Sequence, residues 1–366
     1  SHEAVFALAE LDPDMSAQNV VTPPQILVIY LLVSALLLGL AFSPVVTLIV
    51  LNVFLTVFYT GNFLFKALLV WLGGAAQETS SRAIAAEASL LRDEDLPIYT
   101  VLVPMFREPE VLPILAQALR NLDYPLAKLD IKIVLEEGDH ETIDAARKLD
   151  LEGVFEIIRV PASHPQTKPK ACNFALRYAQ GDFLVIFDAE DKPEPDQLKK
   201  VIAAFNQSAP NTACIQCRLN YYNARENWLT RMFTLDYSLW FDLMLPGLER
   251  LGVPIPLGGT SNHFRMDVLR ELNAWDPFNV TEDADLGIRL TQKGYRVGVI
   301  DSTTFEEANV SIPNWVRQRS RWIKGYMQTF LVHSRRPIHL WQSVGSAGVF
   351  GFIFFIGGTV LSGLLN

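Results

Sequence analysis

Three long apolar runs restrict this chain to folds that place part of it in a membrane. The first, Ile26–Phe42, carries no charged residue, and the second, Val45–Leu72, is interrupted by two Asn and one Lys. The third, Val344–Leu365, is rich in glycine. Each run is close to or longer than the ~18 residues with which a helix crosses the hydrocarbon core of a bilayer. We therefore expect three membrane-spanning helices.

The flank of the first run argues against a signal peptide. Residues 1–24 carry four acidic residues and neither Lys nor Arg, whereas a signal peptide begins with positive charge.

The short break at Ser43-Pro44 predicts a tight helical hairpin. Both outer ends of the hairpin, and everything from Ala75 to Gln342, would then lie on one side of the membrane. The chain stops as the third run stops, so we expect further membrane helices beyond Asn366.

The polar part between the runs has the pattern of an α/β protein. Residues 75–96 are Ala-rich and predict an amphipathic linker helix, and from Ile98 short apolar strands alternate with helical segments. The predicted strands are Tyr99–Pro104, Asp130–Glu137, Phe155–Pro161 and the segment from Asp182; the predicted helices are Pro109–Leu122 with Pro109 in its first turn, His140–Leu149, and Lys170–Gly181 closed by Gly181. This alternation predicts a mostly parallel, doubly wound sheet.

Acidic side chains gather where the predicted strands end. Ligands of such sheets bind at the carboxyl ends of the strands, and the residues at those positions are Arg107, Glu108, Glu136, Glu137, Asp188, Glu190 and Asp191. Carboxylates at neighbouring strand ends repel one another unless a cation shares the site. No GxGxxG motif follows the first strand and no Walker A loop occurs, which argues against a dinucleotide oxidoreductase or an ATPase.

The segment FDAEDKPEP contains the best candidate for a metal site. Asp188 and Glu190 stand two residues apart as the chain leaves a buried strand. Mg²⁺ and Mn²⁺ take such oxygen ligands and accept substrate phosphate oxygens as further ligands. An acidic surface turn before Pro193 is the alternative for this motif alone.

The three cysteines do not form a comparable site. Cys214 and Cys217 are two of the four ligands that a zinc site needs, and no second Cys pair exists. We interpret them as packed strand residues. Free thiols without a disulfide framework suit the cytoplasm.

Two further segments are candidates for catalysis and phosphate binding. In NVTEDADLGIRL, Thr281 is a plausible N-cap, and Glu282 and Asp283 fall in the first helical turn, where the helix dipole favours carboxylates. Helix capping explains this much; the functional hypothesis is that Asp283 is a general base. Lys168 and Lys170 stand at the start of a helix, where phosphate binding and a solvated loop are both open.

The segment PLGGTSNHFR is a candidate acceptor site. Its Gly pair permits close backbone approach, and Thr260, Ser261, Asn262 and His263 offer groups that suit sugar hydroxyls. An ordinary turn is the alternative.

The basic segment QRSRWIKG stands out in a chain of net charge -9. On a helix, Gln318, Arg321 and Trp322 share one face. A juxtamembrane helix that binds anionic lipid is the serious alternative, but lipid binding does not require a Gln and a Trp in register with one Arg. A pyrophosphate beside a sugar ring does.

Taken in order, these motifs resemble those of the processive family 2 glycosyltransferases, which include cellulose and hyaluronan synthases. The resemblance rests on the strand-end acidic residues, the Asp-x-Asp-like pair, Thr-Glu-Asp at 281–283 and Gln-x-x-Arg-Trp at 318–322. It covers roughly residues 97–342 and is strongest to bacterial cellulose-synthase-like β-glucan and exopolysaccharide synthases. It implies a GT-A domain inserted between transmembrane helices of the bacterial cytoplasmic (inner) membrane.

The resemblance divides the chain into segments that we expect to have separate roles. These are an N-terminal segment (1–24), a transmembrane hairpin (25–74), a linker helix (75–96), the GT-A domain (97–310), interface helices (311–342) and a last transmembrane helix (343–366).

The resemblance also implies roles for single residues. The implied donor-binding residues are Pro104, Glu108, Glu136, Glu137, Lys170 and Asp188. The metal would be Mg²⁺ or Mn²⁺, held by Asp188 with Glu190 or Asp191; Glu190 stands where the family usually has Asp, so the choice between them is open. Asp283, preceded by Glu282, is the implied base, and Gln318, Arg321 and Trp322 would hold the diphosphate and the acceptor end.

The expected activity is processive transfer from a UDP-sugar, UDP-glucose for a β-glucan, into a transmembrane channel. Its expected partners are the donor, the growing polysaccharide, membrane lipids and a periplasmic or regulatory subunit, without nucleic acid. Two alternatives stay open: transfer of one sugar to a lipid carrier, and an inactive sugar-binding subunit of an export complex.

Overall fold

The computed structural model describes residues 2–74, 77–149 and 155–365, and its centre is one twisted sheet. Eight described strands are ordered β3-β2-β1-β4-β7-β6-β8-β5. The strands are β1 Tyr99–Met105, β2 Leu129–Glu136, β3 Glu156–Val160, β4 Phe183–Ile186, β5 Lys192–Pro193, β6 Thr212–Tyr221, β7 Asn262–Arg265 and β8 Arg296–Glu306. Strands β1 to β4 are parallel, β6 is parallel to β8, and β7 runs antiparallel between β4 and β6. The predicted mostly parallel α/β sheet is confirmed.

Helices cover both faces of the sheet because its strands are apolar on both sides. In β1, Leu102 packs into one hydrophobic core, whereas Val101 and Val103 pack into the other. The flanking helices are α5 Leu112–Arg120, α6 His140–Lys148, α7 Lys168–Ala175, α8 Gln197–Gln207, α11 Met266–Glu271 and α12 Glu282–Gln292. This arrangement leaves the carboxyl ends of the parallel strands open for a site.

Two predicted helix boundaries are wrong. The helix after β1 begins at Leu112, so Pro113 and not Pro109 occupies its first turn. Gly181 does not close α7, which ends at Ala175 and continues as a 3-10 turn to Tyr178. A Cβ atom on Gly181 would lie 2.5 Å from the backbone nitrogen of Thr100, so this glycine is required where the chain passes β1.

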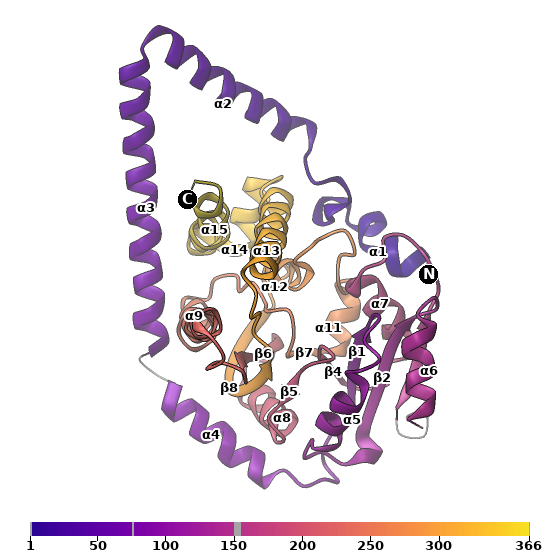
Figure 1. Cartoon of the computed structure of the whole chain (residues 1–366). Coiled ribbons are helices and arrows are strands. Elements are labelled where there is room, and N and C mark those ends of the chain that lie inside the picture. The colour runs from indigo at the N-terminus through magenta and orange to yellow at the C-terminus, as the bar shows by residue number, and fades with distance from the viewer. Residues whose placement is uncertain (1, 75–76, 150–154, 366) are drawn as a thin grey trace.

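Three described helices are long and apolar enough to cross a membrane, namely Ala17–Phe42, Pro44–Gly74 and Pro337–Leu365. The first span contains α2 (Pro23–Phe42), preceded by a 3-10 turn at Ala17–Asn19, and the second is α3 (Pro44–Gly74). Helices α2 and α3 meet at Ser43 as predicted but diverge from there instead of packing along their lengths (Figure 1). The third consists of α14 (Pro337–Phe352), a π-helical turn and α15 (Gly358–Leu365).

Further helices join the sheet to these spans. They are α4 Gln77–Leu90, α9 Trp228–Tyr237, a π-helix Ser238–Met244, α10 Leu245–Leu251 and α13 Ile312–His333. The N-terminal segment forms α1 (His2–Leu11) and two 3-10 turns, and it lies beside α7 (Figure 1). Helix α13 is followed by α14 after three residues, so it connects the sheet domain directly to a membrane-type helix.

Candidate active site

Acidic residues from the ends of β1 and β4 act electrostatically on one another, whereas Glu136 of the predicted third group, after β2, is paired with Lys170. Asp188 and Glu190 follow β4, and Glu108 follows β1. Burial raises the pKa of Glu190, and the neighbouring Asp188 and Glu108 raise it further. Burial and then Asp188 likewise raise the pKa of Glu108. The three carboxyl groups therefore share one electrostatic environment that favours a bound cation.

Lys168 is the cation that the protein itself brings to this cluster. Its Nζ atom lies 2.5 Å from Asp188 Oδ1 and 2.8 Å from the carbonyl oxygen of Gly259. Burial alone would lower the pKa of Lys168, but Asp188, Asp283 and Glu282 together raise it. Lys168 therefore stays charged and lies between the metal-type carboxylates and the Thr-Glu-Asp turn.

Lys170 does not lie at this position, which corrects its predicted role at the diphosphate. Its Nζ atom is 2.8 and 3.0 Å from the two carboxylate oxygens of Glu136, and both side chains are buried. It also donates to the carbonyl oxygen of Pro161 at 3.3 Å. Lys170 and Glu136 thus satisfy each other, and neither is free to bind a donor, while Glu137 is exposed at the end of β2.

Asp191 is buried and bonds the backbone of the acidic turn. Its Oδ2 atom accepts the backbone N–H of Asp188 at 2.6 Å and the hydroxyl of Thr260. Its Oδ1 atom is buried and has no hydrogen-bond partner among the described residues. Burial and Asp188 raise the pKa of Asp191 well above its usual range.

Glu306 belongs to the same acidic environment but was missed from the sequence. It stands at the end of β8, where burial and then Asp191 and Asp188 raise its pKa. The alternation of strands and helices predicts the sheet only as far as β4, so it does not indicate the carboxyl end of β8. The pair Glu306-Glu307 after an alternating apolar run would have been the signal.

Asp283 lies in the first turn of α12 with one oxygen anchored. Its Oδ1 atom accepts the indole N–H of Trp275 at 3.0 Å, and only 6% of the residue is exposed. Burial raises the pKa of Asp283 to about 6, although Lys168 opposes this increase. Burial and Asp283 raise the pKa of the neighbouring Glu282 to about 8. Asp283 is therefore mostly ionised at neutral pH and close to the pKa that suits a general base.

Thr281 is the N-cap residue of α12, as predicted, but its side chain makes no capping hydrogen bond. Its hydroxyl instead approaches Asn279 Oδ1 at 3.4 Å and Thr329 Oγ1 at 3.5 Å. The contact with Thr329 ties the start of α12 to α13. At Gly325 of α13 an added Cβ atom would lie 2.4 Å from the Thr281 side chain, so the two helices touch here.

The Gln-x-x-Arg-Trp residues of helix α13 differ in whether neighbouring side chains hold them. Gln318 Oε1 accepts a hydrogen bond from Asn309 at 3.0 Å, and the half-buried Trp322 packs near Tyr237. Arg319 forms an ion pair with Asp236 and lies over the Trp322 ring. Arg321 is exposed, and no hydrogen bond or ion pair of its side chain occurs among the described residues. It is thus available to an external anion.

The predicted acceptor residues after Gly259 lie inside the sheet, which corrects their proposed role. Thr260, Ser261, Asn262 and His263 are each at most 1% exposed. Ser261 bonds Thr304 at 2.5 Å, and Asn262 donates to the Gly258 carbonyl at 2.6 Å. His263 Nδ1 meets the hydroxyl of Tyr99 at 2.7 Å, and burial lowers its pKa to about 3. Asn262 and His263 lie there because they belong to β7, a central strand between β4 and β6, and Thr260 and Ser261, directly before β7, both donate hydrogen bonds to the carbonyl oxygen of Ile186.

The remaining predicted residues lie on the expected edge or in the core. Pro104 is half-buried near the end of β1. The cysteines Cys214 and Cys217 are free, buried and packed on β6, as predicted.

Asp139 was missed: it caps α6 and accepts the backbone N–H of Arg107 at 2.6 Å, which fixes the loop before Glu108.

Curated proteins that are similar to this chain in sequence include glycosyltransferases. The chain is 27% identical over 241 residues to the beta-monoglucosyldiacylglycerol synthase of Trichormus variabilis, covering 64% of this chain and 50% of that protein. It is 25% identical over 237 residues to glucomannan 4-beta-mannosyltransferase 7 of Arabidopsis thaliana, covering 63% and 42%. The chain therefore spans about half the length of the curated relatives it matches.

A solved structure shares the fold. The mannosyltransferase PcManGT from Pyrobaculum calidifontis, in complex with GDP-Man and Mn²⁺, aligns with a TM-score of 0.57 at 19% identity, covering 82% of this chain and 85% of that one. At this identity the likeness shows the fold alone, which is GT-A. Residues 183–365, half of the 366 residues, match the profile of the family described as "Glycosyl transferase family group 2". The chain belongs to that family.

Proposed function

We propose that this chain is an inverting β-glycosyltransferase in which Asp283 is the general base. The observation that carries the proposal is the state of this carboxylate: it is buried, one oxygen is held by Trp275, and its pKa is raised to about 6. Lys168 and Asp188, which act on it electrostatically, belong to the cluster proposed for the donor.

The reaction is a single displacement. The oxygen of an acceptor hydroxyl attacks the anomeric carbon of the donor as its proton passes to the free oxygen of Asp283. The bond between the anomeric carbon and the diphosphate oxygen breaks, and the nucleoside diphosphate leaves with that electron pair. Attack opposite the leaving group converts an α-linked donor into a β-linked product.

Asp188 and Glu190 fit a divalent metal and would hold it together with donor diphosphate oxygens. The observation that supports the fit is that burial and the neighbouring carboxylates, Asp188 among them, raise the pKa values of Glu108, Glu190 and Glu306. Among the described residues no three acidic, His or Cys side chains converge on one point, so water and phosphate oxygens would complete the shell. Bound Mg²⁺ or Mn²⁺ would neutralise charge on the diphosphate.

Arg321 would bind the diphosphate and Trp322 would support the acceptor sugar. Arg321 is exposed, and no hydrogen bond or ion pair of its side chain occurs among the described residues. Trp322 is fixed by Tyr237 and Arg319 and offers a flat ring one residue further on. Because Thr260–His263 are buried, we assign the acceptor to the α13 side of the site.

We propose UDP-glucose as donor and a growing β-glucan as acceptor, in a bacterial inner membrane. The motif pattern before α14 supports processivity, and the exposed apolar faces of α2 and α3 support a membrane setting. A second candidate is transfer of one glucose to a diacylglycerol-type lipid, which is favoured by the likeness to beta-monoglucosyldiacylglycerol synthase.

Product analysis separates the two candidates. The protein in neutral detergent would receive radiolabelled UDP-glucose, with diacylglycerol in one sample and a short β-glucan in another. We expect long polymer that linkage-specific β-glucanases degrade. A product of one sugar on lipid would replace the first candidate by the second, and lack of transfer from UDP-glucose, GDP-mannose and UDP-N-acetylglucosamine alike would reject both.

A further inference from the structure

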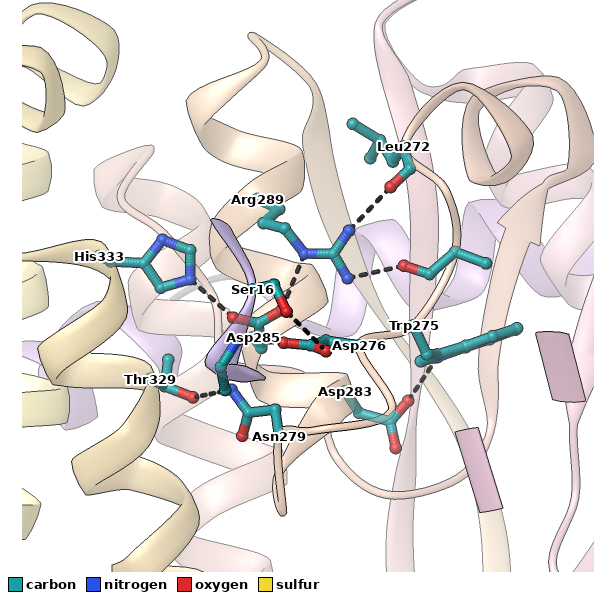
Figure 2. Close-up of polar contacts among 12 residues, drawn as sticks. Ser16, Leu272, Trp275, Asp276, Asn279, Asp283, Asp285, Arg289, Thr329 and His333 are labelled. Atoms are coloured by element: carbon teal, nitrogen blue, oxygen red, sulfur yellow. Dashed lines mark hydrogen bonds and ion pairs between the residues drawn. The ribbon is translucent and has the colours of Figure 1, made fainter. Parts of the chain in front are cut away.

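Trp275 is fixed in a position that serves Asp283. Its indole N–H donates to Asp283 Oδ1 at 3.0 Å, and 1% of the residue is exposed (Figure 2). The Asn173 side chain holds its backbone on both sides, accepting the Trp275 N–H at 3.2 Å and donating to its carbonyl oxygen at 2.8 Å. The ring also packs edge-on against Phe264. Little freedom remains for the indole to turn away from the carboxylate.

A buried ion network holds the turn that leads into Trp275. Arg289 donates to the carbonyl oxygens of Leu272 and Ala274 at 2.9 and 2.6 Å, and its Nε atom bonds Asp285 at 2.8 Å (Figure 2). Asn273 and Ala274 have φ values of 56° and 51°, which L residues adopt only when the surroundings require them.

The same network reaches α13. The other oxygen of Asp285 lies 2.8 Å from His333 Nε2. The helix that carries Arg321 and Trp322 is thereby joined through Asp285 and Arg289 to the turn before Trp275. A buried, charged network of this kind fixes geometry at a cost in desolvation, which is the pattern expected where position matters.

We propose that Trp275 is a positioning residue for the transfer reaction. Its indole N–H holds one oxygen of the ionised Asp283 carboxylate, so that the other oxygen faces the acceptor hydroxyl. This inference rests on the proposed function of Asp283. A hydrogen bond donated to a carboxylate favours its charged form and also restricts its rotation. Trp275 touches no reacting atom and acts only through Asp283.

The other groups around Asp283 do not duplicate this contact. Lys168 on α7 lowers the pKa of Asp283 through space, and Asp188 after β4 raises it. Burial and then Asp283 raise the pKa of Glu282 on the same turn. The thiol of Cys172 is buried, and its burial raises its pKa, so it stays neutral. Removal of the indole N–H should therefore raise the pKa of Asp283 and release its side chain.

The test is the pH dependence of transfer by Trp275→Phe. We expect kcat at neutral pH to fall about tenfold or more, as general-base catalysis loses efficiency when the base is misplaced or protonated. The acidic limb of the kcat profile should move to higher pH. The affinity for UDP with Mn²⁺ and the KM for the donor should change less than about twofold, because no donor contact is lost.

Two variants separate this role from packing. Phe264→Leu removes the ring that packs on Trp275 but leaves the N–H, so it should lower the melting temperature without moving the acidic limb. Benzothienylalanine at position 275, introduced by amber suppression, keeps the ring shape and replaces N–H by sulfur. It should reproduce the kinetic change of Trp275→Phe even if that variant does not fold. Wild-type kcat and pH profile in the benzothienylalanine protein would overturn the proposal.

A double mutant distinguishes failure of this inference from failure of the proposed function. In an Asp283→Asn background, Trp275→Phe should cause no further loss, since it acts through Asp283. If Asp283→Asn itself turns over like wild type, the proposed base is wrong. If Asp283→Asn is inactive while Trp275 variants behave like wild type, only the positioning role is wrong.

Discussion

Lys168 Nζ lies 2.5 Å from Asp188 Oδ1, and the same ammonium group acts electrostatically on Asp283 and Glu282. One lysine thus connects the acidic turn after β4 with the turn that starts α12. Lys170, two residues further along the same helix, is enclosed with Glu136 on another side. The two lysines therefore have separable roles.

Substitution of each lysine by Met should show this separation. Lys168→Met should weaken UDP binding about tenfold or more, because it removes the ammonium group that pairs with Asp188 and that we propose as a contact for the donor phosphates. Lys170→Met leaves Glu136 buried without its partner and should destabilise the fold by about 3–5 kcal/mol while any folded protein still binds UDP. Isothermal titration with UDP and thermal melts measure both effects. Equal loss of UDP affinity in the two folded variants would contradict the assignment.

Asp283→Asn should abolish transfer and leave donor binding nearly intact. The amide cannot accept the acceptor proton, and loss of a general base costs about 10²- to 10⁴-fold in rate. Glu282→Gln, one residue earlier on the same turn, is the matched control and should retain more activity. We would measure polymer yield and UDP affinity for both. Turnover of the Asn protein at the wild-type rate would remove Asp283 from the mechanism.

Transfer should depend on Mg²⁺ or Mn²⁺, and Asp188→Ala and Glu190→Ala should each weaken metal-dependent UDP binding. Two phosphates beside these carboxylates repel them unless a cation intervenes. Glu137→Ala, which changes an exposed acidic residue after β2, should bind UDP like wild type. Undiminished activity in excess EDTA would show that the acidic turn binds no catalytic metal.

The stability of the metal-free protein should decline as pH rises from about 4 to about 8. Burial raises the pKa of Asp283 to about 6 and that of Glu282 to about 8, and it raises the pKa of Glu306 as well. A carboxyl group whose pKa is higher in the folded state stabilises the fold below its unfolded pKa and loses that contribution as pH rises through the folded value. Mn²⁺ should therefore raise the melting temperature more at pH 8 than at pH 5. An equal Mn²⁺ effect at both pH values would contradict this reading.

Arg321 and Arg319 should differ although they stand two residues apart on α13. Arg321→Ala should lower both UDP affinity and rate, and Arg321→Lys should restore part of each, because Lys cannot make a bidentate phosphate contact. Arg319 is paired with Asp236, so Arg319→Ala should change stability by about 1 kcal/mol or less and leave UDP affinity unchanged.

Both arginine variants are best assayed in neutral detergent, where no anionic lipid is present. Trp322→Ala in the same assay should retain UDP affinity and fail in elongation. If Arg319→Ala and Arg321→Ala behave alike in both UDP affinity and polymer yield, the proposed role of Arg321 in the donor site is wrong.

Periodicity and motif order predicted the sheet and the first-turn position of Asp283, because both follow from local pattern. The lysine at the acidic cluster was not predictable, since positions two apart on a helix point about 200° from each other and the pattern does not say which one faces inward. The burial of Asn262 and His263 follows from β7 pairing antiparallel between two distant strands, which no local pattern records. Trp275 reaches Asp283 through a turn with positive φ values at non-glycine residues, which local residue preferences do not predict.

The contacts between α13 and residues 278–285 determine what can be removed from this protein. Gln328 bonds the backbone of Phe278 and Val280, and Thr329 bonds Asn279. His333 completes the set at Asp285. A fragment trimmed to the sheet and its flanking helices would lose every one of these bonds, so the smallest unit able to hold Asp283 in place includes α13, the helix that leads into the apolar helix α14.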